Sequence, residues 1–188
     1  PNLRKEVAAR LVKWVENGGV LFTSGGGLAK SEYNEPVPDL QAVLGLADRK
    51  PLEEWGKMPR YGSVGLGTIR PVLKDKEAVL PTITVQPASS GLPPLSALQL
   101  GREVLQPADH TKILAKFSDG APAVTLNSFG KGKAFVVGFY AGGEYGAGIY
   151  QKTYDTAVNL KAENRAYVTL PLQPAGVRPV VDPQMAPV

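Results

Sequence analysis

The sequence contains no cysteine, a single histidine and no long apolar run, and each of these absences excludes a class of function. Without cysteine, the chain has no disulfide, no thiolate metal site and no cysteine nucleophile. His110 is the one histidine, so a metal ion would depend on carboxylates, and we expect neither a metal site nor a cofactor. No stretch approaches the ~18 consecutive apolar residues of a membrane-spanning helix, and no signal-peptide pattern is present, so we expect no membrane span in this chain.

Charge of one sign is not concentrated anywhere in the chain. The formal net charge is +4, but the Lys and Arg residues are scattered singly and form no basic run. We therefore expect no nucleic-acid partner. The compartment stays open, with an extracytoplasmic location favoured.

Length and composition fit one domain with a proper core. The chain has 188 residues, of which 43% are hydrophobic and 20% charged, so wholesale disorder is not expected. Its 21 glycines and 17 prolines indicate many turns and long connections. The chain opens on a helix without an initial Met, which we interpret as a fragment of a longer protein.

The first 46 residues have the pattern of a helix, a strand and a second helix. Apolar residues recur at helical spacing from Leu3 to Val15, Asn2 is a candidate N-cap, and an Asn-Gly-Gly stop follows at 17–19. The short apolar run at 20–23 predicts a central parallel strand. Residues 36–46 predict a short helix that ends near Gly45.

The rest of the chain alternates between irregular and regular segments. Prolines spread through 47–107 indicate an irregular insertion with two or three strands, including an alternating run at 82–85. Strands are predicted at 112–117, 123–126 and 134–139, as a β-meander packed beside the core sheet. The tail carries a predicted helix at 150–161, a further segment at 167–172 and a proline-broken end.

Three sequence blocks together resemble a known family. L-V-K-W-V-E-N-G-G-V-L-F-T-S-G (11–25), L-Q-A-V-L-G-L (40–46) and F-S-D-G-A-P-A-V-T-L-N-S-F-G-K-G-K-A-F-V-V-G (117–138) resemble class I glutamine amidotransferase-like domains attached to glycoside hydrolases. Within that family, they are most similar to the trimerisation-type accessory domains of β-galactosidases.

The resemblance implies an α/β, flavodoxin-like three-layer sandwich with an added β-meander. It implies that the family's first strand–helix units precede Pro1, so the sheet would be incomplete at the N-terminus. It also implies a domain at 1–165, with the insertion at 47–107, and an exit segment or linker at 166–188 toward a missing domain.

The resemblance also places a nucleophile elbow near Ser24. True amidotransferases carry cysteine at that position, so the glutaminase reaction is not expected. In the glycosidase-attached relatives, the domain shapes an oligomer or closes over the neighbouring barrel.

Two functional alternatives concern the segment that begins at Ser24. A serine hydrolase would need a triad of Ser24, His110 and Asp109, although the adjacent Asp109 and His110 would point opposite ways in an extended segment. Alternatively, Ser24 and the backbone N–H groups of Gly25, Gly26 and Gly27 could bind a small anionic ligand. The simpler interpretation is a plain turn.

Other conspicuous residues have structural interpretations. The G-K-G-K segment at 130–133 lacks the spacing of a phosphate loop, and strands flank it, so a hairpin turn is predicted. Asp39, Asp48, Glu53 and Glu54 are interpreted as a solvated surface rather than a glycosidase pair. Four aromatic residues are candidate interface positions: Trp55, Tyr61, Tyr145 and Tyr150.

These observations favour a non-catalytic accessory or oligomerisation module of a larger, carbohydrate-active protein. Its expected partners are the remainder of its own polypeptide or sister subunits, with carbohydrate as a further candidate. The serine hydrolase and the small-ligand module stay as alternatives.

Overall fold

The structure is a computed structural model that describes residues 3–54, 83–88, 91–96, 98, 100–146 and 162–177. Its helices are α1 (Lys5–Glu16), α2 (Pro38–Leu44), α3 (Ala141–Gly146) and α5 (Ala162–Val168). Its strands are β1 (Val20–Ser24), β2 (Leu46–Arg49), β3 (Glu53–Glu54), β4 (Val85–Pro87), β5 (Gly101–Arg102), β6 (Leu105–Pro107), β7 (Lys112–Phe117), β8 (Pro122–Phe129) and β9 (Gly132–Val137).

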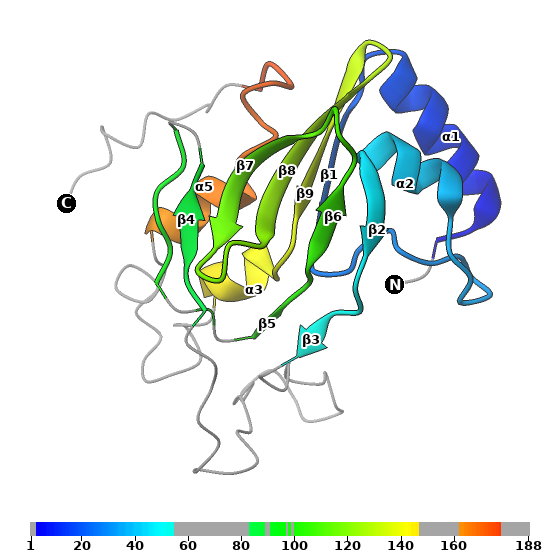
Figure 1. Cartoon of the computed structure of the whole chain (residues 1–188). Coiled ribbons are helices and arrows are strands. Elements are labelled where there is room, and N and C mark those ends of the chain that lie inside the picture. The colour runs from blue at the N-terminus through cyan, green and yellow to red at the C-terminus, as the bar shows by residue number, and fades with distance from the viewer. Residues whose placement is uncertain are drawn as a thin grey trace, which may run out of the picture.

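Five strands form one mixed sheet in the order β1-β9-β8-β7-β4 (Figure 1). β1 pairs in parallel with β9, and the other three pairings are antiparallel. Two further pairs, β2 with β6 and β3 with β5, are antiparallel and lie outside this sheet. The fold is therefore mixed α/β, as the sequence predicts at this level.

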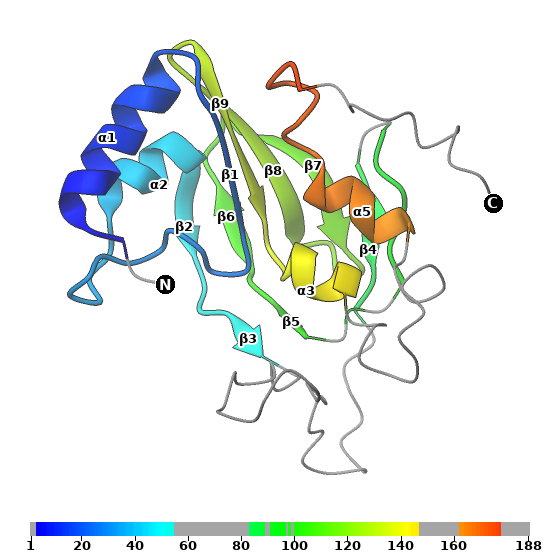
Figure 2. The same cartoon turned by 180° about the vertical axis from the view of Figure 1, so that it is seen from behind.

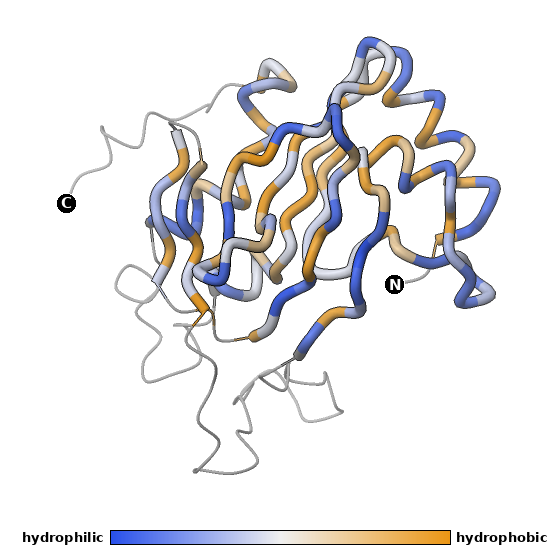
Figure 3. The backbone as a smooth tube through the Cα atoms, viewed as in Figure 1, coloured by the Kyte–Doolittle hydropathy of each residue, from blue (hydrophilic) through white to orange (hydrophobic). Residues whose placement is uncertain are grey.

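The sheet is buried on both faces, and β9 shows how its sequence achieves this. Ala134 and Val136 pack into a cluster with residues of α1, α2, β2 and β6, whereas Phe135 and Val137 pack into a second cluster with α5 and β4. Successive side chains of a strand point to opposite faces, so four consecutive apolar residues bury both sides. Figures 1 and 2 show the α1–α2 layer and the α3–α5 layer, and Figure 3 shows the hydrophobic residues gathered in the central strands.

Helix α1 has the predicted position and the predicted stop. Its cap differs from the prediction, since the N–H of Lys5 donates to the Glu32 carboxylate at 2.9 Å, and Asn2 lies outside the described residues. At the other end, Gly18 adopts a φ of 114°, a left-handed conformation that favours glycine. A Cβ atom on Gly19 would lie 2.4 Å from the Trp14 ring, so the close approach of helix and strand requires glycine there.

Helix α2 ends where the sequence predicts, through a buried contact that the local sequence does not reveal. Gly45 is left-handed (φ 68°). The side-chain amide of Asn127 donates to the carbonyls of Ala42 and Val43, at 3.3 and 2.9 Å, and the Thr111 hydroxyl donates to the Gly45 carbonyl at 2.7 Å. These donors satisfy carbonyl groups that a helix end leaves unpaired.

Two predictions about the sheet are wrong in arrangement. The predicted meander, β7 to β9, does not pack beside a core sheet but forms most of it, because β9 accepts β1 as its parallel neighbour. For the same reason, β1 is an edge strand and not a central one among the described residues. An apolar strand sequence predicts that both faces of the strand are buried, but it does not specify how many neighbouring strands pair with it.

The C-terminal helix α5 runs across the division expected between residues 165 and 166. Tyr167 is fully buried, its ring meets that of Phe139 edge-on at 5.5 Å, and its hydroxyl donates to the Pro93 carbonyl at 2.6 Å. Burial raises the pKa of Tyr167 to about 12, so the phenol stays a donor at neutral pH. The first residues of the expected exit segment therefore contribute to the core. The helix predicted at 150–161 lies outside the described residues.

Among the described residues, none of the helices is both long enough and apolar enough to cross a membrane.

Candidate functional site

The candidate site is the loop at the carboxyl end of β1, residues 24–28. Gly25 and Gly26 have φ angles of 49° and 79°, and Leu28 has a φ of 60°. A Cβ atom on Gly25 would lie 2.5 Å from the Tyr140 ring, and one on Gly27 would lie 2.5 Å from the Thr23 hydroxyl. Both the backbone conformation and the lack of space thus require glycine in this loop.

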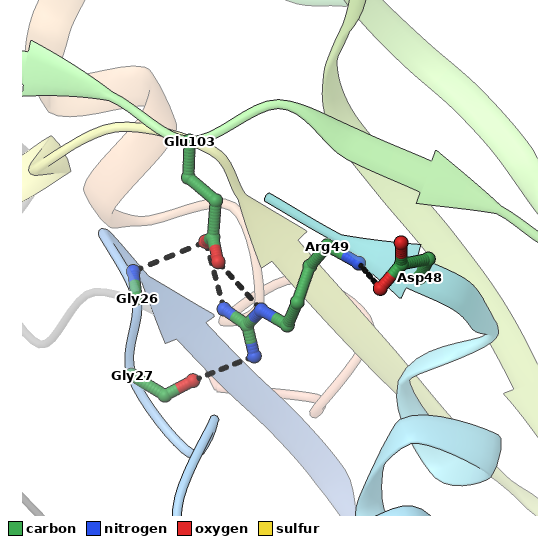
Figure 4. A network of polar contacts seen from close by, with 5 residues as sticks. All are labelled: Gly26, Gly27, Asp48, Arg49 and Glu103. Carbon is green, nitrogen blue, oxygen red and sulfur yellow. Dashed lines mark hydrogen bonds and ion pairs between the residues drawn. The ribbon is translucent and has the colours of Figure 1, made fainter. Parts of the chain in front are cut away.

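A buried ion pair holds this loop (Figure 4). Arg49, at the end of β2, donates from Nε to Oε1 of Glu103 at 2.6 Å and from Nη2 to Oε2 at 2.7 Å. Their side chains are only 5% and 3% exposed. The two parallel hydrogen bonds give the bidentate geometry that is strongest between guanidinium and carboxylate.

The same two side chains also bond to the glycine loop. Oε2 of Glu103 accepts the N–H of Gly26 at 3.1 Å, and Nη1 of Arg49 donates to the carbonyl of Gly27 at 3.1 Å. Asp48 lies outside this contact, where its carboxylate accepts the backbone N–H of Arg49 at 2.8 Å (Figure 4). The ion pair therefore connects the loop after β1, strand β2 and the segment between β5 and β6.

The predicted anion site at the glycine loop is not formed. The N–H of Gly25 donates to the Val137 carbonyl at 3.0 Å, that of Gly26 to Glu103, and that of Gly27 to the Ser24 carbonyl at 3.1 Å. All three donors are used, one of them by a carboxylate of the chain itself. An external anion would have to displace Glu103 from a buried partner, which is unfavourable.

The predicted triad of Ser24, His110 and Asp109 is not assembled either. Phe22 of β1 is paired with Phe135 of β9, and the same row of the sheet continues through Leu126 of β8 to Lys112, the first residue of β7. The start of β7 therefore lies three strand spacings, about 14 Å, from β1. β7 runs in the same direction as β1, and Ser24 lies after the row of the sheet that contains Phe22 and the start of β7, whereas His110 and Asp109 lie before it. Both residues are exposed. Among the described residues, no side chain forms a hydrogen bond with the Ser24 hydroxyl.

An open depression of about 390 Å³ lies along β1. Most of its lining surface is apolar. It is lined by Leu3, Leu21, Phe22, Thr23, Ser24, Gly27 and Leu28. The Ser24 side chain therefore borders an apolar surface, and no described acid, base or amide from another element lines it.

A second polar cluster surrounds Arg102 in β5. Its guanidinium binds the carboxylate of Asp119, lies 3.5 Å from Glu53 and stacks 5.3 Å from the centre of the Phe117 ring. The hydrogen bond from Arg102 lowers the pKa of Asp119. Both carboxylates face the same guanidinium and are largely exposed, so the cluster is a surface ion-pair network and not a pair of opposed acids.

The remaining candidates are mostly peripheral. Of the aromatic interface candidates, Tyr145 lies half-buried in α3, and Trp55, Tyr61 and Tyr150 lie outside the described residues. Asp39 and Asp48 are exposed, in keeping with a solvated surface. Within the described ranges, no cluster of three or more His, Asp or Glu residues could hold a metal ion.

No protein-family model matches the sequence, and no curated protein matches it. The fold, however, is similar to part of several solved β-galactosidases. Gan42B, a GH42 β-galactosidase from G. stearothermophilus, matches with a TM-score of 0.57 and 19% identity over 96% of this chain and 21% of that chain. The cold-adapted β-galactosidase of Rahnella sp. R3 matches with a TM-score of 0.60 and 18% identity over 96% and 22%.

A third β-galactosidase, from the Antarctic haloarchaeon Halorubrum lacusprofundi, matches with a TM-score of 0.54 and 22% identity over 94% of this chain and 21% of that chain. At these identities the similarity shows the fold alone. The chain spans about one fifth of the length of these β-galactosidases.

Proposed function

We propose that this chain is a non-catalytic accessory module of a larger, carbohydrate-active polypeptide, and that it packs against the rest of that polypeptide or a sister subunit. The observation that carries the proposal is the match of nearly the whole chain to a small part of GH42 β-galactosidases. Since fold alone does not specify function, the structure of the loop after β1 supplies the second argument.

The hydrogen bonds of that loop support a structural role and not a catalytic one. A nucleophilic serine needs a base within hydrogen-bond reach and an oxyanion site nearby. Around Ser24, the loop N–H groups already have acceptors, and His110 lies across the sheet. The Arg49–Glu103 pair lies against this loop, and each of the three guanidinium nitrogens of Arg49 donates to Glu103 or to Gly27.

The resemblance to class I glutamine amidotransferase-like domains adds detail to this proposal. In it, Ser24 stands where the catalytic cysteine of an amidotransferase would stand, and the sheet is the remnant of a flavodoxin-like one. The domain would then serve assembly, as the trimerisation-type domains of β-galactosidases do. The parallel β1–β9 pair with α1 and α2 on one face supports this assignment.

The proposal is tested with the complete reading frame that encodes this chain, expressed intact and with residues 3–177 deleted. We expect hydrolysis of p-nitrophenyl β-D-galactopyranoside by the intact polypeptide, none by the isolated chain, and a change in the mass of the assembly after deletion, measured by light scattering. Glycosidase activity of the isolated chain would contradict the proposal.

A fluorophosphonate probe provides the control for the hydrolase alternative. We expect no labelling of the isolated chain, and the same absence in the Ser24→Ala variant. Labelling that disappears on Ser24→Ala substitution would establish a reactive serine and overturn the non-catalytic assignment.

A further inference from the structure

The junction between α1 and β1 contains the one Asn-Gly pair of the sequence, Asn17 and Gly18. Asparagine followed by glycine is the pair most prone to deamidation in peptides, because glycine has no side chain to hinder attack by its backbone nitrogen. Both residues are exposed, so the water that the reaction consumes has access to them. Whether the pair reacts therefore depends on the conformation of its backbone.

Deamidation of such a pair has two steps. The Gly18 nitrogen loses its proton to a base of the solvent and attacks Cγ of Asn17, the bond from Cγ to Nδ2 breaks, and the side-chain amide leaves as ammonia. Water then opens the succinimide ring that has formed. Hydrolysis of the bond between Cγ and the Gly18 nitrogen gives aspartate, whereas hydrolysis of the original peptide bond gives isoaspartate, in which the main chain runs through Cβ and Cγ.

The backbone of Asn17 keeps the two reacting atoms apart. Asn17 has a φ of −86° and a ψ of 6°, and a ψ near zero directs the Gly18 nitrogen toward the Asn17 nitrogen. Ring closure instead requires the Gly18 nitrogen to lie on the same side of the Cα–C bond as Cβ. Since rotation of the side chain does not change ψ, the peptide group between the two residues has to turn before the ring can close.

Hydrogen bonds on both sides of that peptide group oppose its rotation. The N–H of Gly18 donates to the Val15 carbonyl at 2.9 Å, and Nδ2 of Asn17 donates to the Lys13 carbonyl at 2.8 Å. The first bond holds the proton that has to leave, and the second holds the amide group that would depart. Both belong to the end of α1, where they satisfy carbonyl groups of its last turn.

The turn between β8 and β9 contacts the junction on either side of the pair. The N–H of Lys131 donates to the Glu16 carbonyl at 2.9 Å, and the N–H of Lys133 donates to the Gly19 carbonyl at 3.1 Å. A Cβ atom on Gly132 would collide with the Gly19 carbonyl, so the two segments are closely packed. Rotation within the Asn-Gly pair therefore requires the end of α1 to separate from this turn.

We propose that Asn17 is a site of deamidation that is protected while the end of α1 and the β8–β9 turn are in contact, and that reacts when this junction opens. The rate of the reaction in the folded chain then equals the rate in the unfolded chain multiplied by the fraction of molecules in which the junction is open. This inference does not depend on the proposed function, because it uses only contacts within the chain.

The isoaspartate product would prevent the junction from closing again. It inserts one additional atom into the main chain between the carbonyls of Glu16 and Gly19, whose partners Lys131 and Lys133 are fixed in the β8–β9 turn. The two hydrogen bonds to that turn could then not form together.

The aspartate product has a milder effect, because the length of the main chain is unchanged. A carboxylate replaces the amide that donates to the Lys13 carbonyl, and it accepts hydrogen bonds only. It also places a negative charge at the C-terminus of a helix, where such a charge is unfavourable.

Peptide mapping of the whole chain tests the protection. The chain is incubated at mildly alkaline pH, in buffer and in enough urea to unfold it, and trypsin then releases residues 14–30, whose asparagine, aspartate and isoaspartate forms are separated by chromatography and identified by mass spectrometry. We expect deamidation of Asn17 to be at least about tenfold slower in buffer than in urea. Asn34, which is exposed and precedes Glu35, is the internal control and should react little in either condition.

Two results of this experiment would overturn the proposal. Equal rates in buffer and in urea would show that the fold does not protect the pair. The absence of reaction in urea would show that the pair is not a deamidation site.

A matched pair of aromatic substitutions tests the role of the junction. The Trp14 ring packs against Gly19 and is 50% exposed, whereas Tyr33 is 71% exposed and contacts Lys5 at the other end of α1. We expect Trp14→Ala to accelerate deamidation in buffer several-fold and to leave the rate in urea unchanged. Tyr33→Ala should change neither rate, and equal rates for the two folded variants would contradict opening at the junction.

The deamidated chain itself tests the consequence. Ion-exchange chromatography separates it from the unmodified chain, and the Asn17→Asp variant supplies the aspartate product alone. After refolding, we expect the isoaspartyl chain to have a lower Tm than Asn17→Asp and to lose hydrogen-exchange protection at the Lys133 amide, which Asn17→Asp keeps. Equal protection of Lys133 in the two chains would show that the junction closes over isoaspartate and would refute that part of the inference.

Discussion

Replacing Glu103 by glutamine should destabilise the fold strongly, because it leaves a buried guanidinium without its counter-ion. The Arg49 side chain is 5% exposed, and its Nε and Nη2 donate to the two carboxylate oxygens at 2.6 and 2.7 Å. Glutamine has the same shape but no charge and one acceptor oxygen. Breaking a buried ion pair from one side typically costs about 3–5 kcal/mol, which is a large part of the ~5–15 kcal/mol stability of a typical domain.

Urea unfolding followed by circular dichroism measures this loss. For a chain of this size, the expected loss corresponds to a fall in Tm of roughly 6–20 °C. The matched control is Glu35→Gln, which breaks the pair between Lys5 and Glu35. Those side chains are 60% and 57% exposed, so we expect a loss of less than about 1 kcal/mol.

A double variant distinguishes the loss of the attraction between Arg49 and Glu103 from the cost of leaving one buried charge unpaired. In Arg49→Met with Glu103→Met, neither charge is left unpaired, and such replacements are often neutral or stabilising by about 1–4 kcal/mol. Gly26 and Gly27 lose their partners in this variant, but both are partly exposed, and water can replace those partners. We therefore expect most of the stability to return. A loss below about 1 kcal/mol for Glu103→Gln, equal to that of the control, would refute the reasoning.

Three further predictions follow from single contacts. Gly25→Ala should lower the Tm, because its Cβ would lie 2.5 Å from an aromatic ring at a φ of 49°, whereas Gly142→Ala, in open space in α3, should leave the Tm unchanged or raise it. Asn127→Ala should cost about 1–3 kcal/mol in urea unfolding, since the carbonyls of Ala42 and Val43 at the end of α2 lose a donor and the bond to Val43 is buried. The Arg102 hydrogen bond lowers the pKa of Asp119 below 3.8, so its contribution is present above that pH and lost as the pH falls through the lowered pKa. Asp119→Asn should therefore flatten the acid limb of the stability curve, and an unchanged acid limb would contradict the assignment.

The elements that the sequence predicts well are those with strictly local patterns. Helix α1 repeats apolar residues at helical spacing and stops at Gly18, whose positive φ matches the expectation for glycine. The strand predicted at 112–117 has the observed bounds of β7, and the hairpin turn predicted near Gly130 joins β8 and β9. In each case the residues that determine the element lie within it.

The contacts that the sequence does not reveal join distant segments. Arg49 and Glu103 are 54 residues apart, and both lie in a region whose prolines indicated only irregular structure. Asn127 sits in an apolar strand and reaches the end of α2, 84 residues earlier. A signal was available for Asn127, since an amide residue in an otherwise apolar stretch usually has a buried partner, whereas Arg49 and Glu103 have charged neighbours in the sequence and give no such signal. The identity of the buried partner depends on the register of the sheet, which periodicity does not supply.

The position of Glu103 explains how the loop after β1 is held in place. Ligands of α/β sheets bind in the crevice beyond the carboxyl ends of parallel strands, and here β1 and β9 form the one parallel pair of the described sheet. The backbone N–H of Glu103 donates to the carbonyl of Gly138, just after β9, and its side chain accepts the N–H of Gly26, just after β1. Glu103 therefore forms a hydrogen bond just beyond the carboxyl end of each parallel strand, and Arg49 neutralises its charge. A ligand at this crevice would have to displace a buried carboxylate that accepts three hydrogen bonds, so the contacts that stabilise the loop also oppose binding there.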